Sequence, residues 1–142
     1  MNNIRIVLVD DYKFIREILK ILLANLPDIK VIGEAANANE LFTLLKNVKP
    51  DILLMDISMP SMSGIAITEK ISIEYPDVKV IMLTAIENNE KIFDSFRVGA
   101  LGYLPKDIEQ EELVFAIQTV YNGNEYIGKS ISNTYLANQL KI

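Results

Sequence analysis

The chain of 142 residues is 50% hydrophobic and carries a net charge of −5, with a pI near 4.8. This length fits one domain with a sizeable core, and the acidic balance disfavours direct binding of the chain to a nucleic-acid backbone. The absence of cysteine and histidine excludes disulfides, thiolate metal sites and the commonest acid–base group at neutral pH.

Membrane and secretion signals are not evident in the sequence. No apolar run approaches the roughly 20 residues that a membrane helix requires. The N-terminal residues do not follow the plan of a signal peptide and lead directly into a strand-like run. We therefore expect a cytoplasmic protein that does not bind membranes.

Short, continuous apolar runs rich in β-branched residues recur along the chain. They occupy Ile4–Val9, Val31–Ala35, Ile52–Met55, Val78–Leu83 and, more weakly, Leu101–Leu104. Continuous runs of this length are typical of strands that are buried on both faces, as in a parallel sheet.

Segments with helical spacing of apolar residues lie between and after these runs. They cover residues 11–26, 37–48, 64–75, 88–100 and 107–123. Asn37 or Asn39 is a candidate cap for the second segment and Asp107 for the fifth, and Gly99 is suited to end the fourth. In the first segment, Arg16 lies on the polar side of the helix.

Strand and helix therefore alternate five times. With right-handed crossovers, this order predicts an α/β fold with a single doubly wound, five-stranded parallel sheet flanked by five helices. Such sheets bind ligands outside the carboxyl ends of their strands. Functional residues are therefore expected directly after the apolar runs.

Five polar residues stand at those positions. Asp10 and Asp11 follow the first run, Asp56 the third, Thr84 the fourth and Lys106 the fifth. Each of them alone could be a turn acid, a strand residue or a surface charge. Together they would meet at one rim of the sheet, where three carboxylates are costly without cations.

A divalent metal and lysine can supply such cations. Oxygen ligands without histidine or cysteine favour Mg²⁺. A carboxylate beside Mg²⁺ can accept a phosphoryl group, and phosphoryl transfer requires mainly positioning and charge neutralisation. Lys106 and the Thr84 hydroxyl could provide that neutralisation.

Four segments carry a family resemblance. The stretches "LVDDYKFIRE", "DILLMDISMPSMSGI", "VIMLTA" and "GALGYLPKD" occur in this order between Ile4 and Asn122. They resemble the receiver domain of two-component response regulators, most of all receivers of LuxR-type DNA-binding regulators, in which "GYLxKD" recurs. The resemblance implies a flavodoxin-like receiver fold with strand order 2-1-3-4-5, and a receiver domain over residues 1–122.

The resemblance also implies a role for each residue at the rim. Asp56 would be the phosphoacceptor, and Asp11 would ligate Mg²⁺ directly. Asp10 would act through a metal-bound water. Asp56 itself and the backbone carbonyl of Ser58 would complete the protein ligands.

Three further residues take roles from the same resemblance. Lys106 would pair with a phosphoryl oxygen, and Thr84 would move to hydrogen-bond the phosphoryl group. Tyr103 would be the switch aromatic, turning inward when Thr84 shifts. The donor would be a phosphohistidine on a sensor histidine kinase. The chain is then not an enzyme but a phosphoacceptor domain that assists its own phosphorylation and dephosphorylation.

Two positions vary within the family pattern. Pro105 precedes Lys106, where many members have proline after the lysine, and we expect Pro105 in an edge strand, which tolerates a missing N–H. Ile86, two residues beyond Thr84, has no polar group to orient an attacking water. The hypothesis that follows is slow self-hydrolysis of the phosphoryl group.

The output is expected at the far end of the chain. In receivers, the fourth helix, last strand and fifth helix form the output and homodimer surface, which corresponds here to about residues 88–121. Residues 123–142 are expected to be a partly helical tail or linker. Two arrangements are compatible with this tail: a stand-alone receiver, or a receiver taken from a longer regulator. In the second, the expected output is transcription, controlled through a DNA-binding domain that this sequence does not contain.

Two other classes of protein remain as alternatives. A haloacid-dehalogenase-like phosphatase also uses an aspartate nucleophile with Mg²⁺, but its motif needs a second acid where Tyr12 stands. A flavodoxin-like electron carrier needs a phosphate-binding loop after the first strand, where Asp10 and Asp11 would repel the phosphate of the flavin.

Overall fold

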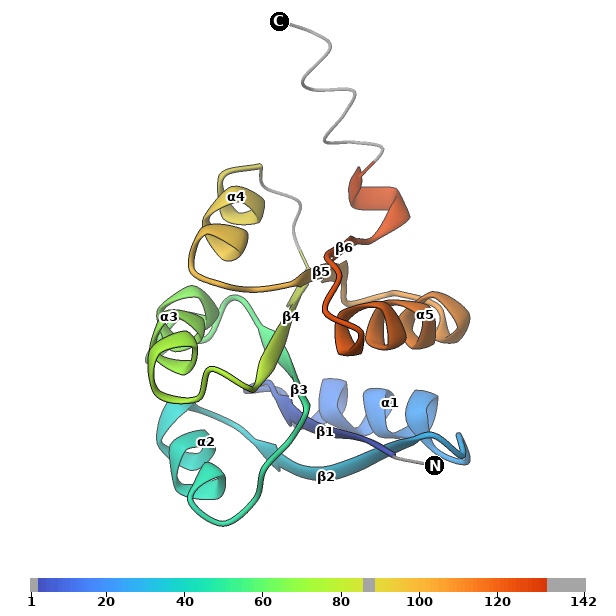
Figure 1. Ribbon diagram of the computed structural model, residues 1–142, viewed down its shortest axis with the longest axis horizontal. Helices are drawn as coiled ribbons and strands as arrows, with labels where there is room; N and C mark the ends of the chain where they lie inside the picture. Colours follow the sequence, from blue (N-terminus) through green and yellow to red (C-terminus); the bar gives the residue numbers. More distant parts are fainter. Residues whose placement is uncertain (1–2, 86–88, 133–142) are drawn as a thin grey trace, which may run out of the picture.

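A six-stranded parallel sheet forms the centre of the computed structural model, which describes residues 3–85 and 89–132 (Figure 1). The strands run in the spatial order β2-β1-β3-β4-β5-β6. Their bounds are β1 Ile4–Val9, β2 Ile29–Ala35, β3 Ile52–Asp56, β4 Lys79–Thr84, β5 Gly102–Pro105 and β6 Tyr126–Ile127. The predicted parallel sheet and the order of its first five strands are confirmed. The predicted number of strands was wrong, because β6 adds a sixth.

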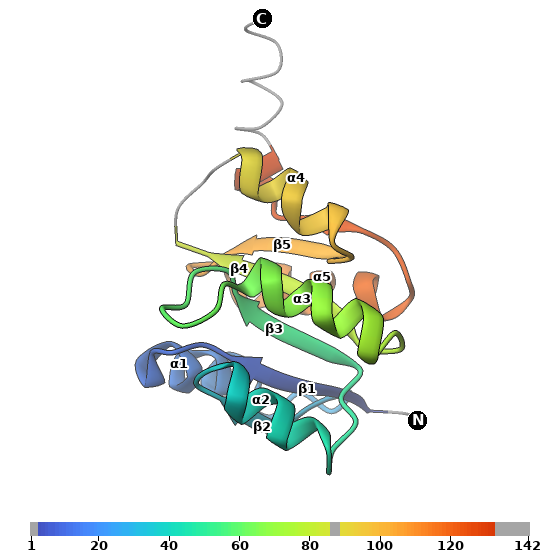
Figure 2. The ribbon, with the colours of Figure 1, turned by 90° about the vertical axis from the view of Figure 1, so that its left-hand side faces the viewer.

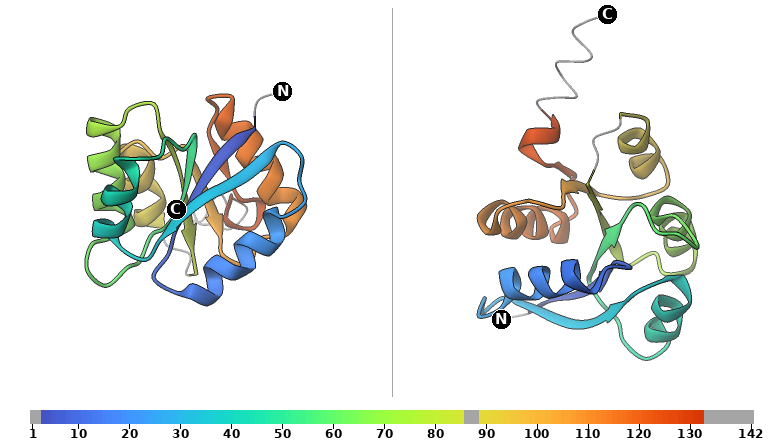
Figure 3. Two further views of the ribbon diagram at one scale, coloured as in Figure 1. Left: turned by 90° about the horizontal axis from the view of Figure 1, so that it is seen from below. Right: turned by 180° about the vertical axis from the view of Figure 1, so that it is seen from behind.

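Five helices cover the two faces of the sheet. Their bounds are α1 Lys13–Leu23, α2 Ala38–Leu45, α3 Gly64–Glu74, α4 Asn89–Arg97 and α5 Gln110–Tyr121. Helices α2, α3 and α4 lie side by side over one face, as Figure 2 shows, and α1 and α5 cover the other (Figures 1 and 3). The doubly wound arrangement is therefore confirmed.

Local chemistry explains where several helices begin and end. The Asn37 side chain accepts a hydrogen bond from the Glu40 amide at 2.9 Å and caps α2. Gly99 ends the turn after α4 at a φ of +113°, which glycine tolerates. The predicted cap at Asp107 was wrong. Asp107 lies in a turn closed by the Ile108 amide and the Pro105 carbonyl, and α5 begins only at Gln110.

The sheet separates two apolar clusters, and β3 contributes to both. Leu53 and Met55 face the cluster beneath α2, α3 and α4, and Ile52 and Leu54 face the cluster beneath α1 and α5. All four side chains are fully buried. Successive side chains of β3 therefore point alternately into the two apolar clusters on either face of the sheet. This packing holds the end of β3, and with it Asp56, at the rim of the sheet.

The sixth strand changes the environment of β5. Tyr126 pairs with Gly102 and Ile127 with Tyr103, so β5 is not the edge strand that the sequence predicted. Pro105 nevertheless lies beyond the last residue that β6 pairs, so its missing N–H leaves no gap in that ladder. Within the described residues, no helix combines the length and apolar character that crossing a membrane requires.

Candidate functional site

Three carboxylates meet at the carboxyl edge of the sheet. Asp10 and Asp11 follow β1, and Asp56 is the last residue of β3. One carboxylate oxygen from each lies within 4.8 Å of the other two. Asp10 and Asp56 are each only 1% exposed. The structure therefore brings together the three acids that the sequence singled out.

Lys106 links two of these acids. Its Nζ lies 3.0 Å from Asp10 Oδ2 and 3.1 Å from Asp56 Oδ1. The Lys106 amide donates a 2.8 Å hydrogen bond to the carbonyl of Thr84, which lies at the end of β4 and is 4% exposed. Four adjacent strands thus deliver the predicted acids, hydroxyl and amine to one rim.

The loop after β3 is shaped to present Asp56. The Ser58 amide donates a 3.0 Å hydrogen bond to Asp56 Oδ1, and the Gly64 amide returns to the Ile57 carbonyl at 3.0 Å. A Cβ on Gly64 would lie 2.8 Å from Ile57 Cα and closer still to the Asp56 carbonyl oxygen. Only glycine fits this crossing, so the spacing from Asp56 to Gly64 has a steric cause.

Arg16 holds the backbone at Asp10, although the sequence had suggested only a polar helix face. Its guanidinium donates a 2.6 Å hydrogen bond to the Asp10 carbonyl and forms a 2.7 Å ion pair with Glu34 on β2. The Arg16 side chain is 13% exposed. Lys20 and Arg16 together lower the pKa of Glu34. Helical periodicity cannot reveal this contact, because it does not show that β2 would carry an acid beside α1.

Electrostatics at the rim oppose full ionisation. Burial raises the pKa of Asp56 to about 6, and the charge of Asp10 adds to the rise, while the Ser58 amide and Lys106 oppose it. For Lys106, burial acts to lower the pKa, but the hydrogen bond to Asp10 and the charge of Asp56 raise it overall. The amine therefore stays protonated between two carboxyl groups.

The donor atoms fit a hard divalent cation. Asp11 Oδ1 and Asp56 Oδ2 are buried, and neither has a hydrogen-bond partner among the described residues. Buried carboxylate oxygens without partners are costly unless a cation or donor meets them. An acidic cluster made only of oxygen ligands matches the preferences of Mg²⁺.

Tyr103 lies in the middle of β5 and is fully buried. It belongs to the same apolar cluster as Ile92 on α4 and Ile131 in the helical residues 129–132. The side chain is therefore in the inward position that the resemblance associates with the switched state. Ile86, the residue of the slow-hydrolysis hypothesis, lies outside the described residues.

One family model and several sequence relatives match this chain. Residues 6–118 match the model of the response regulator receiver domain. The chain is 36% identical to the uncharacterized transcriptional regulatory protein YxjL of Bacillus subtilis, over 97% of this chain and 66% of the relative. It is 37% identical to the oxygen regulatory protein NreC of Staphylococcus aureus, over 95% of this chain and 62% of the relative. The chain thus spans less than two thirds of the length of these curated relatives.

Solved structures give the same result. A LuxR-family two-component response regulator from Aurantimonas sp. SI85-9A1 superposes with a TM-score of 0.90 at 29% identity, covering 98% of this chain and 99% of that one. The signal receiver domain of the putative response regulator NarL from Mycobacterium tuberculosis superposes with a TM-score of 0.82 at 27% identity, covering 87% and 100%.

Proposed function

Since the chain belongs to the response regulator receiver family, we propose that it is a phosphorylation-dependent signalling switch whose phosphoacceptor is Asp56. The observation that carries this proposal is the buried Asp56 carboxylate, held against Lys106 at a rim that also contains Asp10 and Asp11. Phosphoryl transfer depends on positioning and on neutralisation of charge, and this rim offers both.

The proposed donor is a phosphohistidine on a sensor histidine kinase. An Asp56 oxygen attacks the phosphorus and forms a P–O bond. The P–N bond breaks, and its electron pair remains on the donor imidazole, which takes up a proton. Lys106 would pair with one phosphoryl oxygen, and the Thr84 hydroxyl would donate a hydrogen bond to another. We propose that the same groups let the domain assist its own phosphorylation and dephosphorylation.

The residues that would hold Mg²⁺ are Asp11, Asp56 and the backbone carbonyl of Ser58, with Asp10 acting through a bound water. When bound, Mg²⁺ neutralises the carboxylates and the oxygens of the transferred group. The buried, unpartnered oxygens of Asp11 and Asp56 support this assignment.

The proposed output signal depends on the positions of Thr84 and Tyr103. A shift of Thr84 toward the phosphoryl group would stabilise Tyr103 in its inward position and alter the surface formed by α4, β5 and α5. That surface would mediate homodimerisation. Residues 1–122 would be the receiver. Residues 123–142, which begin with a segment that packs on the receiver through β6, would connect it to a DNA-binding output in the cytoplasm. The transcriptional and LuxR-family names of the relatives support this output.

The two alternative classes are not favoured. Tyr12, which stands where the phosphatase motif needs an acid, is 64% exposed and donates its amide to Asp10 at 2.9 Å. The carboxylates of Asp10 and Asp11 occupy the place where a flavin phosphate would bind in a carrier.

Intact-mass measurement after incubation with acetyl phosphate and Mg²⁺ tests the proposal. We expect one phosphoryl adduct on the wild-type protein and none on Asp56→Asn. Asp77→Asn is the matched control, because Asp77 is exposed and precedes β4 at the opposite end of the sheet. Failure of the wild type to load, or equal loading of Asp56→Asn, would refute the proposal. The rate of adduct loss tests the slow-hydrolysis hypothesis, and a lifetime of seconds would contradict it.

A further inference from the structure

The segment after α5 is fastened to the strand that carries Tyr103. The Tyr126 amide donates to the Leu101 carbonyl at 2.8 Å, and the Gly128 amide donates to the Tyr103 carbonyl at 2.8 Å. A Cβ on Gly128 would lie 2.8 Å from Pro105 Cδ, so the two strands approach as closely as glycine allows. The last described part of the chain is therefore hydrogen-bonded directly to the backbone of the proposed switch residue, Tyr103.

A second attachment comes from α5. Glu112 Oε2 accepts a 2.6 Å hydrogen bond from the Tyr126 hydroxyl and a 2.7 Å hydrogen bond from the Lys129 amide. One carboxylate thus joins α5, β6 and the helical residues 129–132. Burial and this hydrogen bond raise the pKa of Tyr126 to about 12, so the hydroxyl remains a donor. The Phe115 ring packs edge-on against Tyr126 with centroids 5.6 Å apart.

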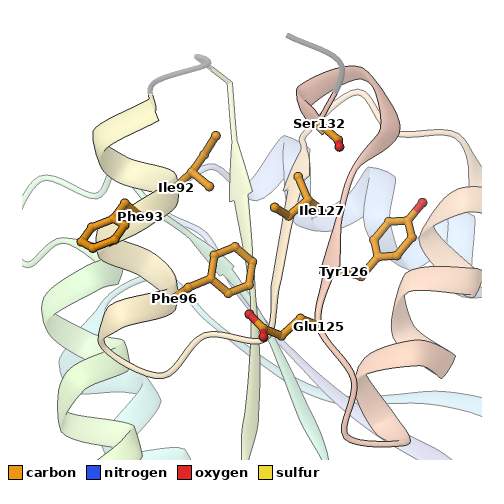
Figure 4. Close-up of a pocket in the computed structure, with 7 residues that line it drawn as sticks. All are labelled: Ile92, Phe93, Phe96, Glu125, Tyr126, Ile127 and Ser132. Atoms are coloured by element: carbon orange, nitrogen blue, oxygen red, sulfur yellow. The ribbon is translucent and has the colours of Figure 1, made fainter. Parts of the chain in front are cut away.

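The third attachment is apolar. Ile131 is 1% exposed and belongs to the cluster that contains Tyr103 and Ile92. Figure 4 shows Ile127 pointing toward α4 and Tyr126 pointing away from α4, toward α5. Residues 126–132, which we call the exit segment, therefore contact β5, α5 and the apolar cluster at once. Tyr126, Ile127 and Ser132 of this segment, together with Glu125, also form one wall of a cavity of about 490 Å³ whose other wall is α4.

We propose that Glu112 is a positioning residue for the output of the switch. It fixes the exit segment to α5, so that a change at β5 displaces the exit segment as a unit. The inference rests on the proposed function, because it requires a change of state at the phosphorylation site. Glu112 touches none of the reacting groups, and its contribution is to hold the exit segment in place.

Amide exchange measured by NMR on the 142-residue chain tests whether Glu112 holds the exit segment in the absence of phosphorylation. Glu112→Ala removes the one oxygen that accepts both hydrogen bonds. We expect the Lys129 amide to exchange about 5–10-fold faster, as for the loss of one ordinary hydrogen bond. Glu112→Gln retains an acceptor oxygen and should restore most of the protection. Glu111→Ala is the matched control, since Glu111 is the exposed neighbour on the same helix. Equal exchange rates of the Lys129 amide in Glu112→Ala and Glu111→Ala would refute the role of Glu112 in holding the exit segment.

Beryllofluoride, a phosphoryl analogue, added with Mg²⁺ tests whether a change at the phosphorylation site reaches the exit segment. We expect loading to change the exchange of amides both near Thr84 and in the exit segment of the wild type. In Glu112→Ala the change near Thr84 should remain and the change in the exit segment should disappear, while the rate of phosphorylation by acetyl phosphate stays the same.

Three results would overturn the coupling. In the first, the wild-type exit segment does not respond although the site does. In the second, Glu112→Ala responds as the wild type does. In the third, Glu112→Ala loses phosphorylation itself. Failure of the wild type to load at all would instead refute the proposed function, and with it the link between the phosphorylation site and the exit segment. The exchange of the Lys129 amide would still decide whether Glu112 holds the exit segment.

Discussion

Replacing Asp56 with asparagine should stabilise the metal-free protein in a pH-dependent manner. Burial raises the pKa of Asp56 from an ordinary value of 3.8 to about 6. The folded protein therefore binds this proton more tightly than the unfolded chain does, and folding stability is lost as the pH rises from 3.8 to beyond 6. At about 1.4 kcal/mol for each tenfold difference in proton affinity, the loss in the wild type is up to about 3 kcal/mol.

An asparagine side chain does not ionise, so the Asp56→Asn variant avoids this loss. In EDTA, urea unfolding followed by circular dichroism should give similar free energies of unfolding for the two proteins near pH 4. Near pH 8, Asp56→Asn should be more stable by up to about 3 kcal/mol, by the same conversion. Millimolar Mg²⁺ should narrow the gap, because a bound cation favours the ionised carboxylate. Asp77→Asn, at an exposed site, should show no such dependence on pH.

A stability difference that stays constant between pH 4 and pH 8 would refute this reasoning. So would a wild type that is the more stable protein at pH 8 in EDTA. Either result would mean that the surroundings of Asp56, chiefly Lys106 and the Ser58 amide, already compensate its charge fully without a metal.

Three further substitutions have definite expected outcomes. Asp11→Ala should abolish Mg²⁺ binding in calorimetry and phosphorylation by acetyl phosphate, and retention of both would contradict its role. Gly64→Ala should lower the free energy of unfolding by about 1–3 kcal/mol, because the new Cβ meets backbone at Ile57, and a urea midpoint like that of the wild type would refute the steric argument. Arg16→Gln should slow phosphorylation several-fold, measured by intact mass over time, because it releases the Asp10 carbonyl. Lys13→Gln, on the exposed side of α1, should not.

The sequence predicted the sheet well because each central strand has a simple apolar signature. Residues 52–55 are buried on both faces, and an uninterrupted apolar run is what such a strand requires. The same pattern predicted which residues would meet at the rim of the sheet, because Asp10, Asp56 and Lys106 each stand where a strand ends. The gathering of these residues at one rim was thus predictable from one rule about parallel sheets and from the residue types at the strand ends.

The parts that the sequence did not predict depend on contacts between distant segments. Tyr126–Ile127 has only two paired residues, too few for a periodic signal, and it becomes a strand because β5 offers carbonyl acceptors. Arg16 and Glu34 are 18 positions apart, and Glu112 and Tyr126 are 14 apart, so no local pattern joins them. The start of α5 was misjudged at Asp107 because a turn there closes on Pro105 instead.

The sixth strand also determines how the protein would behave if it were shortened. A chain cut after Asn122 would keep every residue of the acidic rim but would expose the carbonyls of Leu101 and Tyr103, which now accept from Tyr126 and Gly128. An uncovered strand edge beside a buried aromatic is a template for pairing with other molecules. Such a fragment should therefore be prone to self-association and aggregation, whereas a chain that continues through Ser132 carries its own cover for that edge.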